Sequence, residues 1–201
     1  TSTGTGILTD YALTVNIGGE AEIETNGTGI AVKGTTILNV EGGSIKSGAY
    51  GISADYNNTV NITGGTIETT SYSSAAVKVG AQSQAAISGG TIVGKKNLDG
   101  SADNITVTGG TFQNADGGKA DVSDYLPEGT TQDESGNVVV DESKAVASIG
   151  NVGYTTLAAA VEAAKNGDII TLLKPVEITE SLKINKAVVI DGKGNTLTAK
   201  D

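Results

Sequence analysis

The sequence predicts an all-β chain that forms a right-handed parallel β-helix, a solenoid with one short capping α-helix. Three observations predict this fold. A glycine pair recurs with its first member at positions 42, 64, 89 and 109, so coils of roughly 20–25 residues are expected. A second signal, a small residue followed by Ile or Val, recurs in phase with the first. The chain also has 29 glycines and only 3% aromatic residues, which favours many sharp turns around an aliphatic core. Self-similarity at this period is typical of solenoids.

Each glycine pair is expected to form a corner of a coil. The flanking residues are β-branched, as in Val60-Asn-Ile-Thr-Gly-Gly-Thr-Ile67, which indicates strands on both sides of the pair. Glycine adopts a positive φ without strain and allows a neighbouring backbone to approach closely. A phosphate-binding loop would be followed by a helix, whereas a strand follows each pair here. The predicted corner residues are Gly42, Gly43, Gly64, Gly65, Gly89, Gly90, Gly109 and Gly110, and a degenerate copy lies at Val15–Gly19.

The second signal predicts another short strand in each coil. It occurs at Gly6–Ile7, Gly29–Ile30, Gly51–Ile52 and Ala76–Val77. Aliphatic residues alternate there with polar ones, which is the period of a strand with one buried and one solvated face. Each coil therefore has at least two strands, and a third is expected after the glycine pair, as at Thr66–Glu68. Equivalent strands should stack in parallel about 4.8 Å apart, with right-handed crossovers.

Three parts are predicted along the chain: β-helix coils over residues 1–113, a linking and end-closing segment over 114–145, and the helix-capped start of a second β-helix segment over 146–201. The middle part lacks the repeat. Its turn-rich sequence, followed by Val138–Val140, indicates a hairpin-like turn that closes the end of the first coils.

The capping helix is expected near residues 155–166. Four small aliphatic residues recur there at helical spacing: Leu157, Ala160, Val161 and Ala164. Thr155 is the expected N-cap and Gly167 the expected stop. Short strands are expected around the helix, at residues 146–150, 169–173, 176–178, 182–184 and 188–190.

The segment from Tyr154 to Leu197 resembles the start of a pectin-lyase-like β-helix module, of the kind found in surface proteins of Gram-positive and gut bacteria. The resemblance rests on the helix, on the motif Gly167-Asp-x-Ile-x-Leu-Leu and on the run Ser181-Leu-x-Ile-x-Lys-x-Val-Val-Ile-Asp-Gly-x-Gly-x-Thr-Leu197. It implies that the helix caps a solenoid and that the later run begins its first coils. It implies a fold and not an activity, because many members are catalytically silent.

With this assignment, the chain opens in the middle of one solenoid and closes at the beginning of another. Two explanations are open. The chain is a segment of a longer tandem protein, or it is a subunit whose C-terminal coils continue into the N-terminal coils of the next copy. Open β-helix edges leave backbone groups unpaired, and a head-to-tail contact that does not close produces filaments. The expected assembly residues are Ile7 at one end and Val188, Ile190 and Leu197 at the other.

The composition argues against catalysis. The chain has no His or Cys, which excludes nucleophilic catalysis by those residues. Its 13 basic residues are all lysines, whereas lyases of the family that the chain resembles typically use an arginine base. A glycosidase would need two carboxylates across a cleft. The candidates share no position relative to the glycine pairs: Asp55, Glu68, Asp99 and Asp103. We therefore expect no enzymatic activity and no cofactor.

Calcium is the one metal that the sequence brings into consideration. Asp116, Asp121 and Asp124 could surround Ca²⁺, which takes six to eight oxygen ligands. They match neither an EF-hand loop nor the glycine-rich calcium repeat. Solvated carboxylates in turns are the simpler interpretation.

Charge and composition limit the partners. A net charge of −10 without arginine disfavours nucleic acid. No run of about 18 apolar residues is present, which argues against membrane insertion. A cysteine-free, acidic chain rich in Thr, Asn and Gly is typical of an extracellular or cell-surface protein of a bacterium that does not rely on disulfides.

Two classes of function follow. The first is a non-enzymatic extracellular structural protein: a surface stalk, an adhesin module or a self-assembling filament subunit, whose partners are further copies or neighbouring modules. The alternative is a carbohydrate-binding β-helix module. Tyr50 and Tyr72 each lie seven residues after the second glycine of their coils, with Tyr56 nearby, so together they could present one face to glycans. The simpler interpretation is that these tyrosines cover loop edges.

Overall fold

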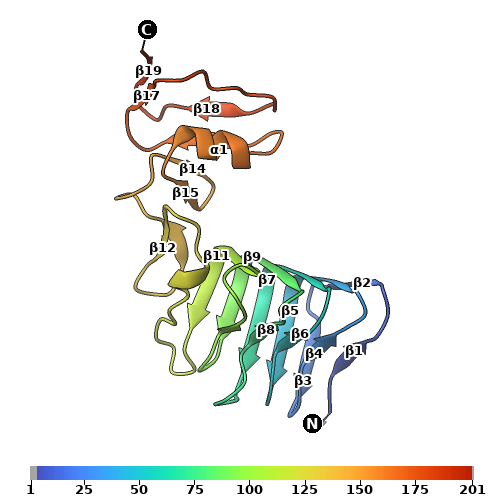
Figure 1. The fold of residues 1–201 in the computed structure, drawn as a ribbon. Helices are drawn as coiled ribbons and strands as arrows, with labels where there is room; N and C mark the ends of the chain where they lie inside the picture. Colours follow the sequence, from blue (N-terminus) through green and yellow to red (C-terminus); the bar gives the residue numbers. More distant parts are fainter. Residues whose placement is uncertain (1–3, 201) are drawn as a thin grey trace. The chain divides into compact units, whose positions relative to one another are not determined.

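The computed structural model describes residues 4–200 and consists of two compact units (Figure 1). The first unit runs to Leu126 and includes residues 132–137, and the second comprises residues 127–131 and the chain from Val138 onward. Both units are built mainly from β-strands, as the sequence predicts. Among the described residues, no helix is both long enough and apolar enough to cross a membrane.

The first unit is a parallel β-helix in which equivalent strands of successive coils lie side by side (Figure 1). One of its sheets contains the short strands predicted from the second sequence signal. The order in this sheet is β1 (Ile7–Thr9), β4 (Ile30–Val32), β6 (Ile52–Ala54), β8 (Val77–Val79) and β10 (Leu98–Asp99). All neighbours are parallel. The sequence pattern misses β10 because Asn97 stands where earlier coils have glycine or alanine.

The second sheet contains the strands around the glycine pairs. In four coils the strands before and after the pair form one long strand: β5 (Ile37–Ser47), β7 (Thr59–Thr69), β9 (Gln84–Val93) and β11 (Ile105–Gln113). In the first coil they are separate, as β2 (Thr14–Ile17) and β3 (Glu22–Thr25). Four residues separate Ile17 from Glu22, whereas three separate their partners Val40 and Ser44. The extra residue interrupts the strand at the degenerate glycine pair.

The two glycines of each pair are required for different reasons. The second has a positive φ, +79° at Gly65 and +82° at Gly90, which a side chain rarely adopts. The first has no room for a side chain in the pairs that begin at 64, 89 and 109, and at Gly42 the nearest backbone atom would lie 3.1 Å from an added Cβ. A Cβ added at Gly64 would lie 2.3 Å from the carbonyl oxygen of Glu41, and one at Gly89 would lie 2.3 Å from that of Thr63. The predicted corners are therefore present, and neighbouring coils touch through their backbones there.

Columns of stacked aliphatic side chains fill the interior of the first unit. One column after the glycine corner consists of Ile45, Ile67, Ile92 and Phe112, which are in register and fully buried. Burying each such side chain contributes about 1.5–3 kcal/mol. The buried columns therefore consist of the apolar residues that the alternating sequence pattern predicts to face inward.

A column of buried polar side chains follows one corner of the same unit. The backbone N–H of Thr36 donates to Oδ1 of Asn58 at 2.9 Å, and the backbone N–H of Asn58 donates to Oγ of Ser83 at 3.2 Å. Asn58 also donates to the carbonyl of Val32. Each side chain thus satisfies a backbone group of the preceding coil, which removes the penalty for burying it.

Residues after β11 cover the outer edge of that strand. The backbone N–H of Phe112 donates to the carbonyl of Gly136, and that of Ala120 donates to the carbonyl of Phe112, both at 3.0 Å. The side chain of Gln132 donates to the carbonyl of Ala120 and accepts from the N–H of Val122. The segment contains one short 3₁₀-helix, η1 (Ser123–Tyr125). The last coil of the first unit therefore ends in a paired edge.

The second unit combines a hairpin, one helix and two parallel strand pairs. Its elements are β13 (Val138–Val140), β14 (Ala147–Ile149), β15 (Val152–Tyr154), α1 (Leu157–Ala163), β16 (Ile169–Leu172), β17 (Val176–Ile178), β18 (Val189–Asp191) and β19 (Leu197–Ala199). A further strand, β12 (Thr130–Gln132), pairs with β13. β14 is antiparallel to both β15 and β16. β16 pairs with β18, and β17 with β19, in parallel and at the coil period of the first unit.

The helix is shorter than predicted and begins at a different cap. Thr156, and not Thr155, is the N-cap, because its Oγ1 accepts the N–H of Ala159 at 3.1 Å. The helix stops at Ala163 since Ala164 has an extended ψ of 149°. Gly167 has a φ of +93° and forms the turn that follows.

The apolar face of α1 packs on β14 and β16. The buried cluster consists of Ala147, Leu157, Ala160, Val161, Ala164, Ile170 and Leu172. The expected strand at 182–184 is absent: this stretch has no regular secondary structure, although Leu182 packs against the cluster. The expected strand at 188–190 is β18, displaced by one residue. The apolar pattern at 182–184 therefore reflects side-chain packing against the cluster and not pairing with another strand.

Candidate functional site

Outward-facing side chains of the first unit form hydrogen bonds and ion pairs between neighbouring coils. Nδ2 of Asn39 donates to Oδ1 of Asn16 at 2.7 Å, and Nδ2 of Asn61 donates to Oδ1 of Asn39 at 2.8 Å. On the far side of the glycine corner, Lys46 Nζ lies 3.6 Å from a carboxylate oxygen of Glu68. These side chains satisfy one another between coils, as structural ladder residues do.

Two more of the carboxylates considered for a glycosidase form ion pairs, Asp55 with a lysine of the next coil and Asp99 with a lysine of its own coil. Lys78 Nζ lies 2.8 Å from Asp55, and Lys96 Nζ lies 2.8 Å from Asp99. The hydrogen bond from Lys78 to Asp55 raises the pKa of Lys78 above its usual value, with a smaller opposing contribution from burial. These carboxylates are held as partners of lysines.

Tyr50 and Tyr72 do not occupy equivalent places, despite their equal spacing from the glycine pairs. Tyr50 lies two residues before β6, and its carbonyl accepts the N–H of Gly29 in the preceding coil. Tyr72 lies in a loop that has three more residues than the corresponding loop of the coil before it. The insertion carries Tyr72 away from the stack, and 84% of its surface is exposed.

Each of these two tyrosines has a lysine over its ring. The Nζ of Lys78 lies 5.3 Å from the ring centroid of Tyr50, and the Nζ of Lys95 lies 4.9 Å from that of Tyr72. Tyr56 is also exposed but follows β6 at the opposite end of that strand from Tyr50. The three tyrosines therefore do not form the single row that the sequence suggested.

A groove surrounds Tyr72, and we call it the Tyr72 groove. It crosses the corners of three successive coils and has a volume of roughly 740 Å³. Its lining consists of Glu68, Thr69, Thr70, Ser71, Tyr72, Lys95, Asn114, Ala115 and Asp116. Glu68, Tyr72 and Asp116 are candidate residues from the sequence, each for a different role, and nothing in the sequence pattern placed them together. The uneven lengths of equivalent loops are the signal that could have located it.

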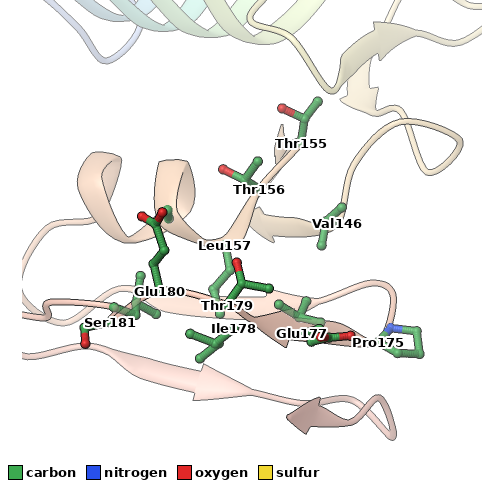
Figure 2. Close-up of a pocket in the computed structure, with 13 residues that line it drawn as sticks. Val146, Thr155, Thr156, Leu157, Pro175, Glu177, Ile178, Thr179, Glu180 and Ser181 are labelled. Carbon is green, nitrogen blue, oxygen red and sulfur yellow. The ribbon is translucent and has the colours of Figure 1, made fainter. Parts of the chain in front are cut away.

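A second hollow, roughly 460 Å³ in volume, lies in the second unit between the start of α1 and the segment after β17. Figure 2 shows Leu157 and Ile178 facing this space, with Glu180 at its rim. Leu157 belongs to the buried cluster, and the hydroxyl of the lining residue Thr156 is engaged as the helix cap. We interpret this hollow as the packing gap between α1 and the first coil of the second unit.

Of the three aspartates considered for calcium, Asp116 and Asp121 accept hydrogen bonds in turns and Asp124 lies in η1. Oδ1 of Asp116 accepts the N–H of Gly118 at 3.0 Å, and Oδ1 of Asp121 accepts the N–H of Ser123 at 2.9 Å. The latter bond lowers the pKa of Asp121. Within residues 4–200, no three acidic, His or Cys side chains gather in a way that could hold a metal ion. Asp121 and Asp124 line a smaller cavity that adjoins the Tyr72 groove and shares Lys95 and Asn114 with it.

Three of the four predicted assembly residues lie on strands at the end of a sheet. Within residues 4–200, β1 with Ile7 pairs only with β4, and β18 with Ile190 pairs only with β16. Leu197 is in β19 and is 43% exposed. Val188 directly precedes β18 and packs against the cluster under α1.

Comparison of the chain with protein-family models, with curated proteins and with solved structures gave no match. The stacked parallel sheets by themselves place the first unit in the class of parallel β-helix solenoids.

Proposed function

We propose that this chain is a non-enzymatic structural module of an extracellular bacterial protein, a surface stalk or adhesin segment of the pectin-lyase-like β-helix type. The observation that carries the proposal is the register of the first unit, in which long strands pair in parallel coil after coil. Each coil contacts its neighbours through backbone hydrogen bonds, buried columns and outward ladders. Such a stack sets a fixed distance along its axis, which is the property a spacer needs.

The surface supports this role. The net charge of −10 keeps an exposed rod soluble and limits association. Charged side chains of the first unit are used in pairs between coils, such as Lys46 with Glu68 and Lys78 with Asp55. An extracellular location is in keeping with the absence of cysteine.

An activity panel tests the non-enzymatic part of the proposal. The purified chain is incubated with polygalacturonate and with neutral polysaccharides, with and without Ca²⁺, and new reducing ends and unsaturated uronides are measured. We expect no product above that of heat-denatured protein. Product that accumulates in proportion to the native chain would overturn the proposal.

A distance measurement tests the spacer. The chain has no cysteine, so spin labels can be attached at Thr14→Cys and Thr106→Cys, two exposed positions in the first and fifth coils. Four coil spacings of about 4.8 Å, with an offset of two residues (about 6.6 Å) along the strand, predict a Cα separation of about 20 Å. A narrow distribution of distances is expected. A broad distribution in the folded chain would contradict a rigid spacer.

The partners proposed for this module are further coils. Leu8 on β1 and Val189 on β18 are 53% and 55% exposed, on strands that have one neighbouring strand each in the part of the chain that the structure describes. A pairing strand could come from neighbouring modules of a longer chain or from a second copy. Negative-stain electron microscopy over a range of concentrations distinguishes the two: fibres indicate copies joined end to end, and short single particles indicate neighbouring modules.

A further inference from the structure

The Tyr72 groove has features that the structural role does not require. The other coils turn the same corner with a shorter loop, so the three additional residues are not needed to continue the stack. The groove volume of roughly 740 Å³ lies within the range of small-molecule sites, about 300–1,000 Å³. An insertion that leaves a tyrosine almost fully exposed beside such a groove needs a separate explanation.

The ring of Tyr72 is available for stacking. The Nζ of Lys95 lies over one face of the Tyr72 ring, 4.9 Å from the ring centroid, and Tyr72 is 84% exposed. Tyrosine presents a large apolar surface with few rotatable bonds, so little conformational entropy is lost when a planar or ring-shaped ligand covers it. The C–H face of a sugar ring is a surface of that kind.

The polar groups around the ring are held in place by their own neighbours. Oγ of Ser71 accepts the N–H groups of Ser73 and Ser74, which leaves its hydroxyl proton free to be donated. Nδ2 of Asn114 donates to the carbonyl of Lys119 at 2.9 Å. Oδ1 of Asp116 accepts from Gly118, which leaves its second oxygen as an acceptor. Groups fixed in this way bind hydroxyls without first having to be ordered.

The charges in the groove select the kind of sugar. Glu68 and Asp116 contribute two carboxylates and Lys95 one ammonium group, on a chain that is strongly acidic. Polyanions such as uronides would be repelled by the carboxylates. The hydroxyls of a neutral sugar can donate to these carboxylates and accept from Lys95, so a neutral ligand satisfies both signs of charge.

We propose that the Tyr72 groove binds a neutral oligosaccharide, with one sugar ring stacked on Tyr72 and its hydroxyls bonded to Asp116, Asn114 and Lys95. The proposal is independent of the structural role, since a rod of this kind works as a spacer whether or not its loops bind glycans. It would make the module a spacer that also attaches to a glycan surface.

The test is calorimetric titration of the chain with cellohexaose, maltohexaose and mannohexaose, and with hexagalacturonate as the acidic counterpart. We expect at least one neutral hexasaccharide to bind. Tyr72→Ala should weaken that binding about tenfold or more, which corresponds to about 1.4 kcal/mol. Tyr11→Ala is the matched control: Tyr11 is 77% exposed in the first coil and is no part of the groove, so binding should remain within about twofold.

A second variant separates a sugar from a cationic ligand. Asp116→Asn keeps an oxygen acceptor and removes one charge, so a neutral sugar should bind within about fivefold of the parent chain. The polycation spermine serves as the competing probe. The proposal is overturned if no neutral hexasaccharide binds, if Tyr72→Ala and Tyr11→Ala bind equally, or if only hexagalacturonate or spermine binds. Because Tyr72 is so exposed, both tyrosine variants should unfold at the same temperature as the parent, and circular dichroism checks this.

Discussion

Replacing the first glycine of a corner pair tests how closely the coils are packed. A Cβ added at Gly64 would lie 2.3 Å from the carbonyl oxygen of Glu41, whereas real Cβ contacts are essentially never below 3.0 Å. The two coils would have to separate there by about 0.7 Å or more. The obstructing atom belongs to the backbone, so no side chain can rotate away to relieve the clash.

The expected loss in the free energy of unfolding can be estimated from the groups that surround Gly64. Overpacking a well-packed site costs about 1–3 kcal/mol. Separating β5 from β7 also strains hydrogen bonds on both sides of the corner, each worth about 1 kcal/mol. We therefore expect Gly64→Ala to lower the free energy of unfolding by about 3 kcal/mol. For a chain of this size that corresponds to a decrease in Tm of roughly 6–12 °C.

The matched control is Gly18→Ala, the same substitution near the corner of the first coil. The φ of Gly18 is not positive, and the nearest atom to an added Cβ would be 4.0 Å away. Alanine there should leave the stability unchanged or raise it by about 0.4–1 kcal/mol, because it restricts the unfolded chain. Thermal and urea unfolding of both variants are followed by far-ultraviolet circular dichroism. Equal unfolding midpoints for the two variants would refute the argument that backbone contact requires the first glycine.

Three further predictions concern the core, the outer ladder and acid stability. Ile67→Ala, in a fully buried column, should cost about 2–5 kcal/mol, whereas Ile37→Ala, at a 42% exposed position, should cost well under half as much in the same urea unfolding assay. Asn39→Ala removes two hydrogen bonds between coils and should cost about 1–2 kcal/mol; no loss on urea unfolding would show that the amide ladder is only a surface feature. Hydrogen bonds lower the pKa of Asp121, chiefly from Ser123, and of Asp133, chiefly from Asn137, below the usual 3.8. The pKa of each carboxyl is lower in the folded chain than in the unfolded chain, so each carboxylate stabilises the folded state fully above the unfolded-state pKa. This stabilisation is lost as the pH falls through the folded-state pKa. Urea midpoints measured from about pH 7 down to about pH 2 should therefore be steady near neutrality and fall in acid, and Asp133→Asn should reduce that dependence; an unchanged acid profile in this variant would contradict the assignment.

Spacing alone was a poor guide to the candidate site. Tyr50 and Tyr72 have the same sequence distance from their glycine pairs, yet the longer loop removes Tyr72 from the stack. The contact between Lys95 and the ring of Tyr72 joins residues of adjacent coils, and Asn114 reaches the groove from the coil after that. The greater length of the Tyr72 loop can be read from the sequence, but the residues of the next two coils that line the groove beside it cannot, because their proximity arises from the stacking of the coils.

The sequence by itself determined the coil period, the parallel stacking and the corners, because glycine spacing and aliphatic alternation act locally and repeat in every coil. It also located the capping helix, although Thr156 rather than Thr155 caps it, since the two neighbouring threonines are equally suited by residue type. Only the tertiary structure decided that residues 182–184 form no strand, because a strand needs a partner in register. It alone also brought Glu68, Tyr72 and Asp116 around one groove, since their proximity arises from stacking coils that are far apart along the chain.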